Sequence, residues 1–306
     1  MVPTTEWVVT DRGRLPVAKV AARQLRTRLT GVWTMLEAAC RERHEPKRLH
    51  ELRVASRRTL AALEGFGELV PPRQARWFSK QLRRIRRTAG ETRDLDVLLD
   101  RLTKEPQPKG GPQDWQRLLI RLARHRDQSR RPLKKLRGKL RSAEWVSRVE
   151  KLGKRVAAAE ADESLAAFAR RGLPSVLQRF FAQADRRLKD PEEMHQLRIA
   201  GKKLRYMLEV LAPGLSQAAR AKGLVVLEEM QESLGSFVDH AGAAERFRRW
   251  ARKADPRRTR RLLIGLAERE EDLANSARRR FARWWTVTRR RKLSKSFLTS
   301  SRRRRA

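Results

Sequence analysis

A histidine and two arginines stand at helical spacing in the first part of the chain. Arg53 and Arg57 follow His50 by three and seven positions, and Arg58 flanks them. At about 100° per residue, His50, Arg53 and Arg57 share one face of a helix, while leucines fall on the opposite face. A guanidinium group donates two parallel hydrogen bonds to adjacent phosphate oxygens. Because these groups lie about one helical turn apart along a line, the pattern predicts a site for a linear polymer with a charge on every repeat.

The same pattern returns 145 residues later in the chain. Segments 46–64 and 191–209 align without a gap, and the register persists to the pairs Gly90/Gly235 and Asp94/Asp239. A solvated surface has no need to recur in register, so we predict two copies of one helical unit, related by a pseudo-two-fold axis. The motif helices of both copies are expected to line a shared basic groove. The second copy contributes His195, Arg198, Lys202, Lys203, Arg205 and Tyr206.

A further basic stripe lies on the helix expected at 73–89, opposite an apolar stripe that includes Phe78 and Leu82. The corresponding helix of the second copy carries Glu228 and Glu229, so the sequence leaves open whether that helix adds to the binding surface. The basic stripe of the first copy consists of Lys80, Arg83, Arg84 and Arg87.

The fold class predicted from the sequence is all-α. Apolar residues at three- and four-residue spacing run through almost the whole chain, and strand-like alternation is scarce. Breaks rich in proline and glycine, of which 105–112 is the strongest, separate the segments. The expected helices span 16–43, 47–65, 73–89, 93–104, 114–140, 143–158, 163–188, 192–211, 215–234, 237–253 and 257–290.

These helices predict a division of the chain into two repeats with additional material. The expected parts are an N-terminal segment (1–14), a first repeat (15–110), connecting helices (113–160), a second repeat (161–255), a C-terminal helix (256–290) and a basic disordered tail (291–306). The two repeats and the connecting helices form one domain at 15–255, with a basic central groove.

The charge of the chain indicates its class of partner. Its 306 residues include 74 Lys and Arg against 35 Asp and Glu, a formal net charge of +39. Such a field concentrates polyanions. The single Cys40 excludes an internal disulfide framework, and no Cys cluster offers a metal site. The chain shows neither a secretory signal nor a run of about 18 apolar residues. We therefore expect a cytoplasmic protein with no membrane partner.

The histidines and the tyrosine of the basic faces each keep two interpretations. His50 and His195 either donate to a phosphate or hydrogen-bond a neighbouring helix, and surrounding cations favour their neutral form until an anion arrives. Tyr206 either offers its hydroxyl to a ligand or packs against the protein. The eight tryptophans are scattered and are assigned to the core.

Carboxylates near the basic faces are expected to have structural roles. Glu64 and Glu209 lie at the edges of these faces and are expected to orient guanidinium groups by ion pairing. Asp94, Asp96 and Asp100 fall near the expected start of a helix, where they would cap backbone N–H groups and complement the helix dipole.

Several motifs together resemble one known family. They are H-x-x-R-[VI]-x-x-[RK]-[RK]-x-x-x-x-L, which begins at His50 and again at His195, the Leu204–Tyr206 triplet LRY, the segment RDLDV at Arg93–Val97, and S-L-G-x-x-x-D at Ser233–Asp239. This set resembles the CHAD family, the conserved histidine α-helical domain, over nearly the whole chain. The resemblance implies two four-helix units around a basic cavity, binding of inorganic polyphosphate, and association with polyphosphate granules.

Three functions follow from these observations, and the first is our main prediction. It is non-catalytic binding of inorganic polyphosphate, with no catalytic residue, metal or cofactor. The second is general binding of nucleic acid through its phosphates, which the charge favours although no reading helix or base-stacking motif is present. The third, a polyphosphate-processing enzyme, usually requires carboxylate-held metal, and neither a Gly-Lys-Ser/Thr phosphate loop nor an E-x-E-x-K signature is found. The sequence leaves oligomeric state and polymer length open.

Overall fold

Helices make up the computed structural model, which describes residues 12–42, 45–104, 112–186, 188, 190–214, 217–254 and 257–302. Within these ranges no strand forms, and an isolated bridge pairs Pro16 with Ser164. The all-α prediction is confirmed. In chain order the elements are η1 (Arg12–Arg14), α1 (Val17–Arg41), α2 (Pro46–Gly65), α3 (Pro72–Lys104), α4 (Pro112–Ser129), α5 (Arg131–Lys139), α6 (Ser142–Ala157), α7 (Leu165–Ala184), α8 (Pro191–Leu211), η2 (Ala212–Gly214), α9 (Gln217–Ala251), α10 (Arg257–Trp284) and α11 (Val287–Arg302).

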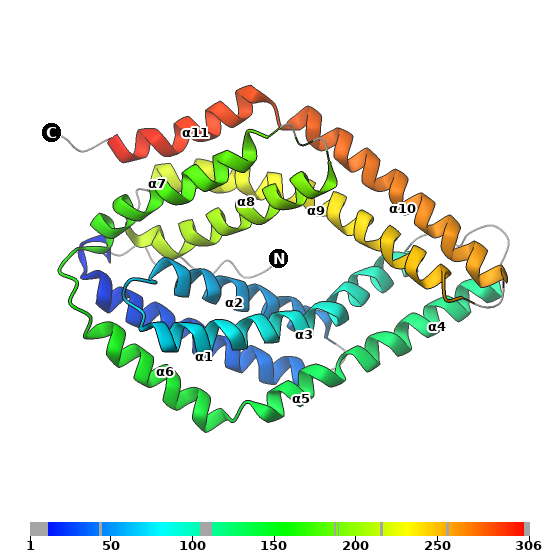
Figure 1. Cartoon of the computed structure of the whole chain (residues 1–306), viewed down its shortest axis with the longest axis horizontal. Helices are drawn as coiled ribbons and strands as arrows, with labels where there is room; N and C mark the ends of the chain where they lie inside the picture. The colour runs from blue at the N-terminus through cyan, green and yellow to red at the C-terminus, as the bar shows by residue number, and fades with distance from the viewer. Residues whose placement is uncertain are drawn as a thin grey trace.

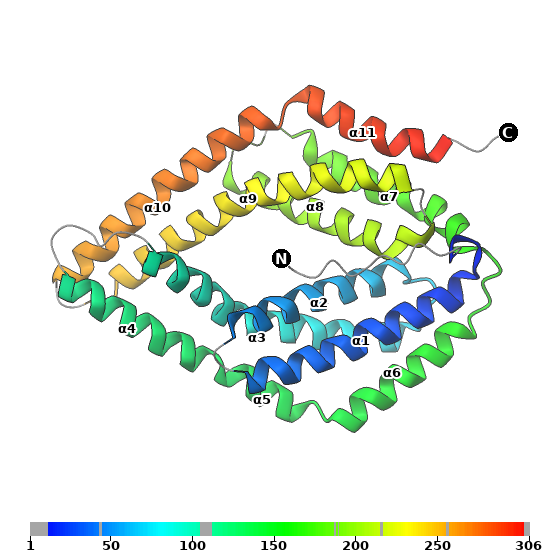
Figure 2. The same ribbon diagram turned by 180° about the vertical axis from the view of Figure 1, so that it is seen from behind.

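Two units of four helices follow each other in the same order, α1 to α4 and then α7 to α10 (Figure 1). In each unit the second helix, α2 or α8, carries the histidine motif and packs against the first and third helices. The helices α2 and α8 also pack against each other, so the two motifs meet in the middle of the molecule (Figures 1 and 2). The prediction of two four-helix units, with extra helices between and after them, is confirmed.

The motif helices begin in the same way and touch at one end. Pro46 and Pro191 open them, since a helix start is the place where a missing backbone N–H does no harm. The side chain of Asp190 accepts a backbone N–H from the first turn of α8. At the other end, a Cβ on Gly65 would lie 2.8 Å from the Sδ of Met207 in α8. Gly65 therefore allows the close approach of the two motif helices.

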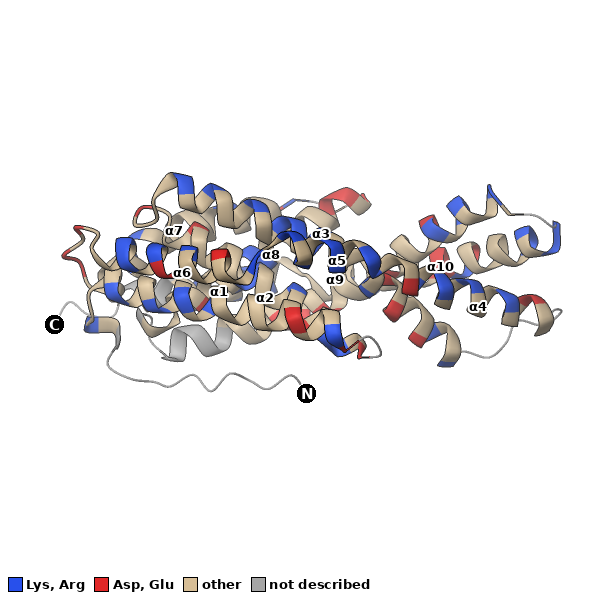
Figure 3. Ribbon diagram, turned by 90° about the horizontal axis from the view of Figure 1, so that it is seen from below, with Lys and Arg blue, Asp and Glu red and all other residues tan. Residues whose placement is uncertain are grey.

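Three clusters of buried apolar side chains hold the helices in place. The first fills the first unit and joins Leu49 and Leu52, on the apolar face of α2, to Trp145 of α6. The second fills the second unit and includes Phe281 of α10. The third joins the far ends of α3 and α9 to α4 and α10, and these four segments form a distal arm, at the right in Figure 3. The core assignment is confirmed for Trp33, Trp115, Trp145 and Trp285, while Trp7 lies outside the described residues.

Several helix boundaries differ from the expected ones. α3 and α9 are continuous where breaks were expected near Gly90 and Gly235. Both glycines lie against an arginine side chain of the motif helix, so they serve a packing contact inside a helix. Conversely, the expected helix 114–140 divides after Ser129, and the expected helix 257–290 divides after Trp284.

The basic tail was expected to be disordered, and this is wrong for residues 291–302. They belong to α11, whose Leu293 and Phe297 are buried in the second core. A Cβ on Gly223 of α9 would overlap the ring of Phe297, so the missing side chain at this glycine leaves room for the ring. Two apolar residues four positions apart are a weak signal within a run of arginines. Residues 303–306 and 1–11 lie outside the described chain.

Membrane insertion finds no support in the helices described. None of them combines the length and the low charge that a bilayer crossing requires.

Candidate polyanion-binding site

Cations from both motif helices meet where α2 and α8 pack together. Lys202 of α8 is half-buried, and the positive charges of Arg198 and Arg205 on its own helix and of Arg57 on α2 act on it. Arg57 and Lys202 hold the same register position in the two copies, so the repeat brings equivalent cations to one place. We call this group the central cluster and define it as His50, Arg53, Arg57, Arg86, Arg93, Arg198, Lys202, Arg205 and Tyr206, with Asp94 and Asp239 at its edge.

The environment of Lys202 strongly disfavours its charged form. Partial burial is the largest cause, and the like charges of Arg198 and Arg57 add to it, while Asp239 opposes them. Together they lower the pKa of Lys202 from 10.5 to about 7. A lysine with so low a pKa lies where a positive charge is unfavourable. An anion bound at this place would be strongly favoured.

His50 belongs to the same charge field. Partial burial and the positive charges of Arg93, Arg57 and Arg53 lower its pKa, so its imidazole is neutral near pH 7. On the other motif helix, His195 is half-buried and has no polar partner among the described residues. The structure thus places His50 within the central cluster and leaves His195 beside it.

Two arginines of the cluster lie against glycines of the neighbouring helix, in the same register in both units. A Cβ on Gly90 of α3 would lie 2.5 Å from Nη1 of Arg53, and the same nitrogen donates to the backbone carbonyl of Arg86 at 3.2 Å. In the second unit, a Cβ on Gly235 of α9 would lie 4.0 Å from Nη2 of Arg198. The missing side chains make room for guanidinium groups, more tightly in the first unit than in the second.

Asp94 lies where the two units face each other across α3 and α9. The side chain of Asp94 is 54% exposed, but loss of hydration from its surroundings raises its pKa, against the pull of Arg53 and Arg246, and the nearby carboxylate of Asp239 raises it further. Its Oδ2 lies 3.7 Å from Nη2 of Arg246 on α9. Asp94 therefore pairs with an arginine of the other unit, and the equivalent carboxylate, Asp239, acts on Arg198 through its charge.

The capping role expected for three aspartates is wrong, because α3 has no start at this point. Asp94 faces arginines as described, and Asp100 pairs with Lys104 one turn later at 2.8 Å. Asp96 is buried and accepts a hydrogen bond of 2.7 Å from Nε of Arg126 on α4. All three lie within the continuous helix, where no N–H group is left for them to cap.

Glu209 orients guanidinium groups beside the cluster. It is 6% exposed, and its Oε2 lies 2.7 Å from Nε of Arg58 across the contact between α8 and α2. Its other oxygen lies 3.7 Å from Arg205. The role expected for Glu209 is confirmed, and Arg58 is held by a carboxylate at the rim rather than within the cluster. Glu64 is exposed and makes no ion pair with any described residue, so the same role is not found for it.

Tyr206 is only 5% exposed and lies among cations. The guanidinium of Arg205 lies 5.3 Å from the centre of its ring. Arg86 and Arg198 lie near enough to interact electrostatically with Tyr206. The packing interpretation of Tyr206 is therefore supported by its burial, and its position between the helices places it at the cluster.

The basic stripe of α3 is only partly joined to the central cluster. Arg83 and Arg87 lie close enough to Arg86 to lower its pKa, after the larger effects of burial and Arg57. Three other predicted site residues are exposed and are not brought to the cluster by any contact in the described chain; these are Lys80 and Arg84 on α3 and Lys203 on α8.

The third helix of the second unit, α9, carries acidic side chains that pair with arginines of neighbouring helices. Glu228 of α9 lies 3.6 Å from Arg205, and Glu229 lies 3.5 Å from Arg289 of α11. α9 therefore neutralises cations at positions where α3 carries them. Lys and Arg nevertheless outnumber Asp and Glu along much of the molecule (Figure 3).

Sequence reasoning missed two cations of the cluster, Arg86 and Arg93, and a third, Arg246, that pairs with Asp94 at its edge. Arg86 and Arg93 are seven positions apart and share one face of α3, a signal that disappears when a break is assumed at Gly90. Arg246 stands 145 positions after Arg101, so the repeat register extends further than the motif alone indicates.

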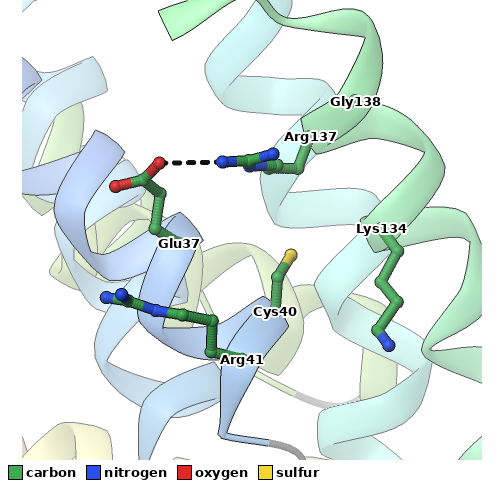
Figure 4. A pocket seen from close by; sticks show the side chains of 6 residues that line it. All are labelled: Glu37, Cys40, Arg41, Lys134, Arg137 and Gly138. Carbon is green, nitrogen blue, oxygen red and sulfur yellow. Dashed lines mark hydrogen bonds and ion pairs between the residues drawn. The ribbon is translucent and has the colours of Figure 1, made fainter.

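A separate cavity of about 350 Å³ lies between α1 and α5 (Figure 4). Cys40 and Lys134 line it, and Arg137 pairs there with Glu37 at 3.0 Å. Partial burial raises the pKa of the Cys40 thiol, and the positive charges of Arg137 and Lys134 offset this only in part. The thiol therefore stays protonated at neutral pH and is not activated. In the part of the chain that is described, no three His, Cys, Asp or Glu side chains are grouped as metal ligands.

Comparison with known proteins adds a family model and two solved structures. The family model described as "CHAD domain" matches residues 23–248. The crystal structure of the CHAD domain from the plant Ricinus communis is 23% identical with a TM-score of 0.68, and the match covers 87% of this chain and 93% of that one. PptA from Streptomyces chartreusis is 17% identical with a TM-score of 0.64, and the match covers 89% and 99% of the two chains. No curated protein sequence matches the chain.

Proposed function

The chain belongs to the CHAD domain family, which is associated with polyphosphate binding, and we propose that it binds inorganic polyphosphate at the central cluster. One observation carries the proposal. Arg57, Arg198 and Lys202, from helices of two different units, are held together although their charges repel. An anion between them would remove that repulsion and would accept hydrogen bonds from each, so the free protein is arranged for a negatively charged ligand.

The distribution of charge favours a polymer over a single phosphate. Arg83 and Arg87 lie about one helical turn apart on α3, and their charges act on Arg86, so they extend the cluster along this helix. A linear polyanion can neutralise these groups one after another, and each contact releases a condensed counterion. A single small anion would satisfy only one or two of them.

Binding without turnover is part of the proposal. The cluster offers cations and a tyrosine, and its two carboxylates, Asp94 and Asp239, already face Arg53 and Arg198. A chain that holds the polymer and leaves it intact suits residence on polyphosphate granules, which is the location we propose. General nucleic-acid binding is the alternative, and a competition experiment separates the two.

The test is displacement of labelled double-stranded DNA by long-chain polyphosphate at physiological salt, with concentrations expressed per phosphate. We expect polyphosphate to displace DNA at a concentration at least tenfold lower than unlabelled DNA requires, because its flexible chain fits the cluster and a rigid duplex meets only diffuse charge. The same mixture with Mg²⁺ should release no orthophosphate. Equal displacement by both polymers would favour the nucleic-acid alternative, and sustained orthophosphate release would show an enzyme.

The contact between Gly90 and Arg53 provides a second test of the site. Gly90→Ala should push the Arg53 guanidinium away from α3 and weaken polyphosphate binding about tenfold, the value of one charge-assisted hydrogen bond. The free energy of unfolding should not decrease, because the displaced group is the end of a flexible side chain and alanine favours a helix. Gly31→Ala in α1 is the matched control, since a Cβ there meets nothing within 4 Å. Equal affinities of the two variants would remove Arg53 from the site.

A further inference from the structure

A second cavity, of about 580 Å³, lies on the distal arm between α4 and the adjoining ends of α9 and α10. Its floor is apolar, because Leu118, Leu122 and Leu263 are buried in the third core. Ile120, on its wall, is 53% exposed although it is a large apolar side chain. The cavity has the size and the apolar lining of sites that hold small organic ligands.

Cations surround this apolar floor. Arg117, Arg121, Arg124 and Lys253 line the cavity, and the one carboxylate among its lining residues is Asp114. Asp114 lies 3.7 Å from Arg117, while the other three cations form no ion pair with any described residue. The rim therefore carries unneutralised positive charge, which selects for a ligand with more than one negative charge.

Aromatic groups form part of the same wall. Trp250 and His125 line the cavity, and their rings meet edge to face with centres 6.2 Å apart. Phe247 packs edge to face with the indole at 5.9 Å between ring centres, and the Arg246 guanidinium lies 5.8 Å from the indole centre. A half-buried tryptophan fixed in this way offers a rigid surface for a flat ring.

We infer that this cavity is a second ligand site, and that its ligand is a nucleoside polyphosphate. Inorganic polyphosphate would leave the leucine floor and the tryptophan unused, and an uncharged ring would leave the cations unused. A nucleotide uses both, since its base can lie against Trp250 while its phosphates reach Arg121 and Lys253. No residue that lines the cavity belongs to the central cluster, so this inference does not depend on polyphosphate binding.

The test is calorimetric titration of the full chain with ATP, inorganic tripolyphosphate and adenosine. We expect ATP to bind about tenfold more tightly than adenosine, because adenosine lacks the phosphates. Trp250→Leu should weaken ATP binding about tenfold, as loss of one base–aromatic contact does, and leave tripolyphosphate binding unchanged. Ile120→Glu, at an exposed position that does not endanger folding, should weaken ATP binding by a similar factor, because it places a carboxylate among the rim cations.

The double variant Arg57→Ala/Lys202→Ala distinguishes the cavity from the central cluster. It should bind ATP as the unaltered protein does and lose affinity for tripolyphosphate. The inference is overturned if this variant loses ATP while Trp250→Leu and Ile120→Glu keep it, since ATP would then use only its phosphates at the cluster. It is equally overturned if ATP shows no saturable binding, or if adenosine binds as tightly as ATP.

Discussion

Replacing Arg57 and Lys202 together by alanine is expected to weaken the binding of long polyphosphate on the order of a hundredfold at pH 6. Each residue can give the polymer a charge-assisted hydrogen bond, worth about 1.5–3 kcal/mol, and each 1.4 kcal/mol is a factor of ten. The two residues adjoin, so their effects need not add. At pH 6 Lys202 is protonated, because its pKa is about 7, and its full contribution is measured.

The control for this variant is Lys151→Ala/Lys154→Ala on α6, which removes two charges from exposed positions remote from the motif helices. Loss of diffuse charge alone should weaken binding only severalfold. The cluster variant should also unfold at a temperature no lower than the unaltered protein, because the change relieves repulsion between like charges. If the two double variants bind polyphosphate equally, the binding surface is diffuse and the central cluster is not the site.

The prediction of the fold from the sequence succeeded because the repeat supplies long-range information. A constant offset of 145 residues relates α2 to α8. It implies that Arg57 and Lys202 hold equivalent positions. Because the two motif helices pack on each other, these equivalent residues also lie close together. A helical wheel alone could not have shown this, because it gives the direction of a side chain and not the element that faces it.

The errors at the site have the same physical origin. Gly90 carries the statistical signal of a helix break, yet its small size serves the approach of Arg53, and only the position of α2 reveals this. With the break assumed, Asp94 was expected to cap a helix, whereas it lies inside α3 and faces Arg246 from the other unit. Lys80 sits on a well-formed basic stripe, but it is exposed and no contact within the described chain joins it to the cluster. In each case tertiary contacts, which leave no trace in local spacing, decided the outcome.

Polyphosphate binding should take up a proton, and the affinity should fall as the pH rises above 7. Free Lys202 has a pKa of about 7, lowered chiefly by partial burial and then by Arg198 and Arg57. The negative polymer favours the ammonium form, so the pKa of Lys202 is higher in the complex than in the free protein. Between these two values the complex binds more protons than its components, and its affinity decreases with pH by up to about tenfold per unit. Below pH 6 this group is charged in both states, and its contribution to the slope vanishes.

Lys202→Arg is the decisive variant, because the equivalent position of the first copy already holds an arginine, Arg57, and an arginine keeps its charge throughout this range. It should bind polyphosphate at pH 6 about as well as the unaltered protein and retain that affinity at pH 8 and 9. The internal phosphates of the polymer stay ionised over the same range, and the lowered pKa of free His50 places the start of its response below that of Lys202. Affinities measured from pH 6 to 9 at constant ionic strength, with the proton count taken from calorimetry in buffers of different ionisation enthalpy, test both statements. A slope that persists unchanged in Lys202→Arg would show that the proton enters elsewhere and that Lys202 does not touch the polymer.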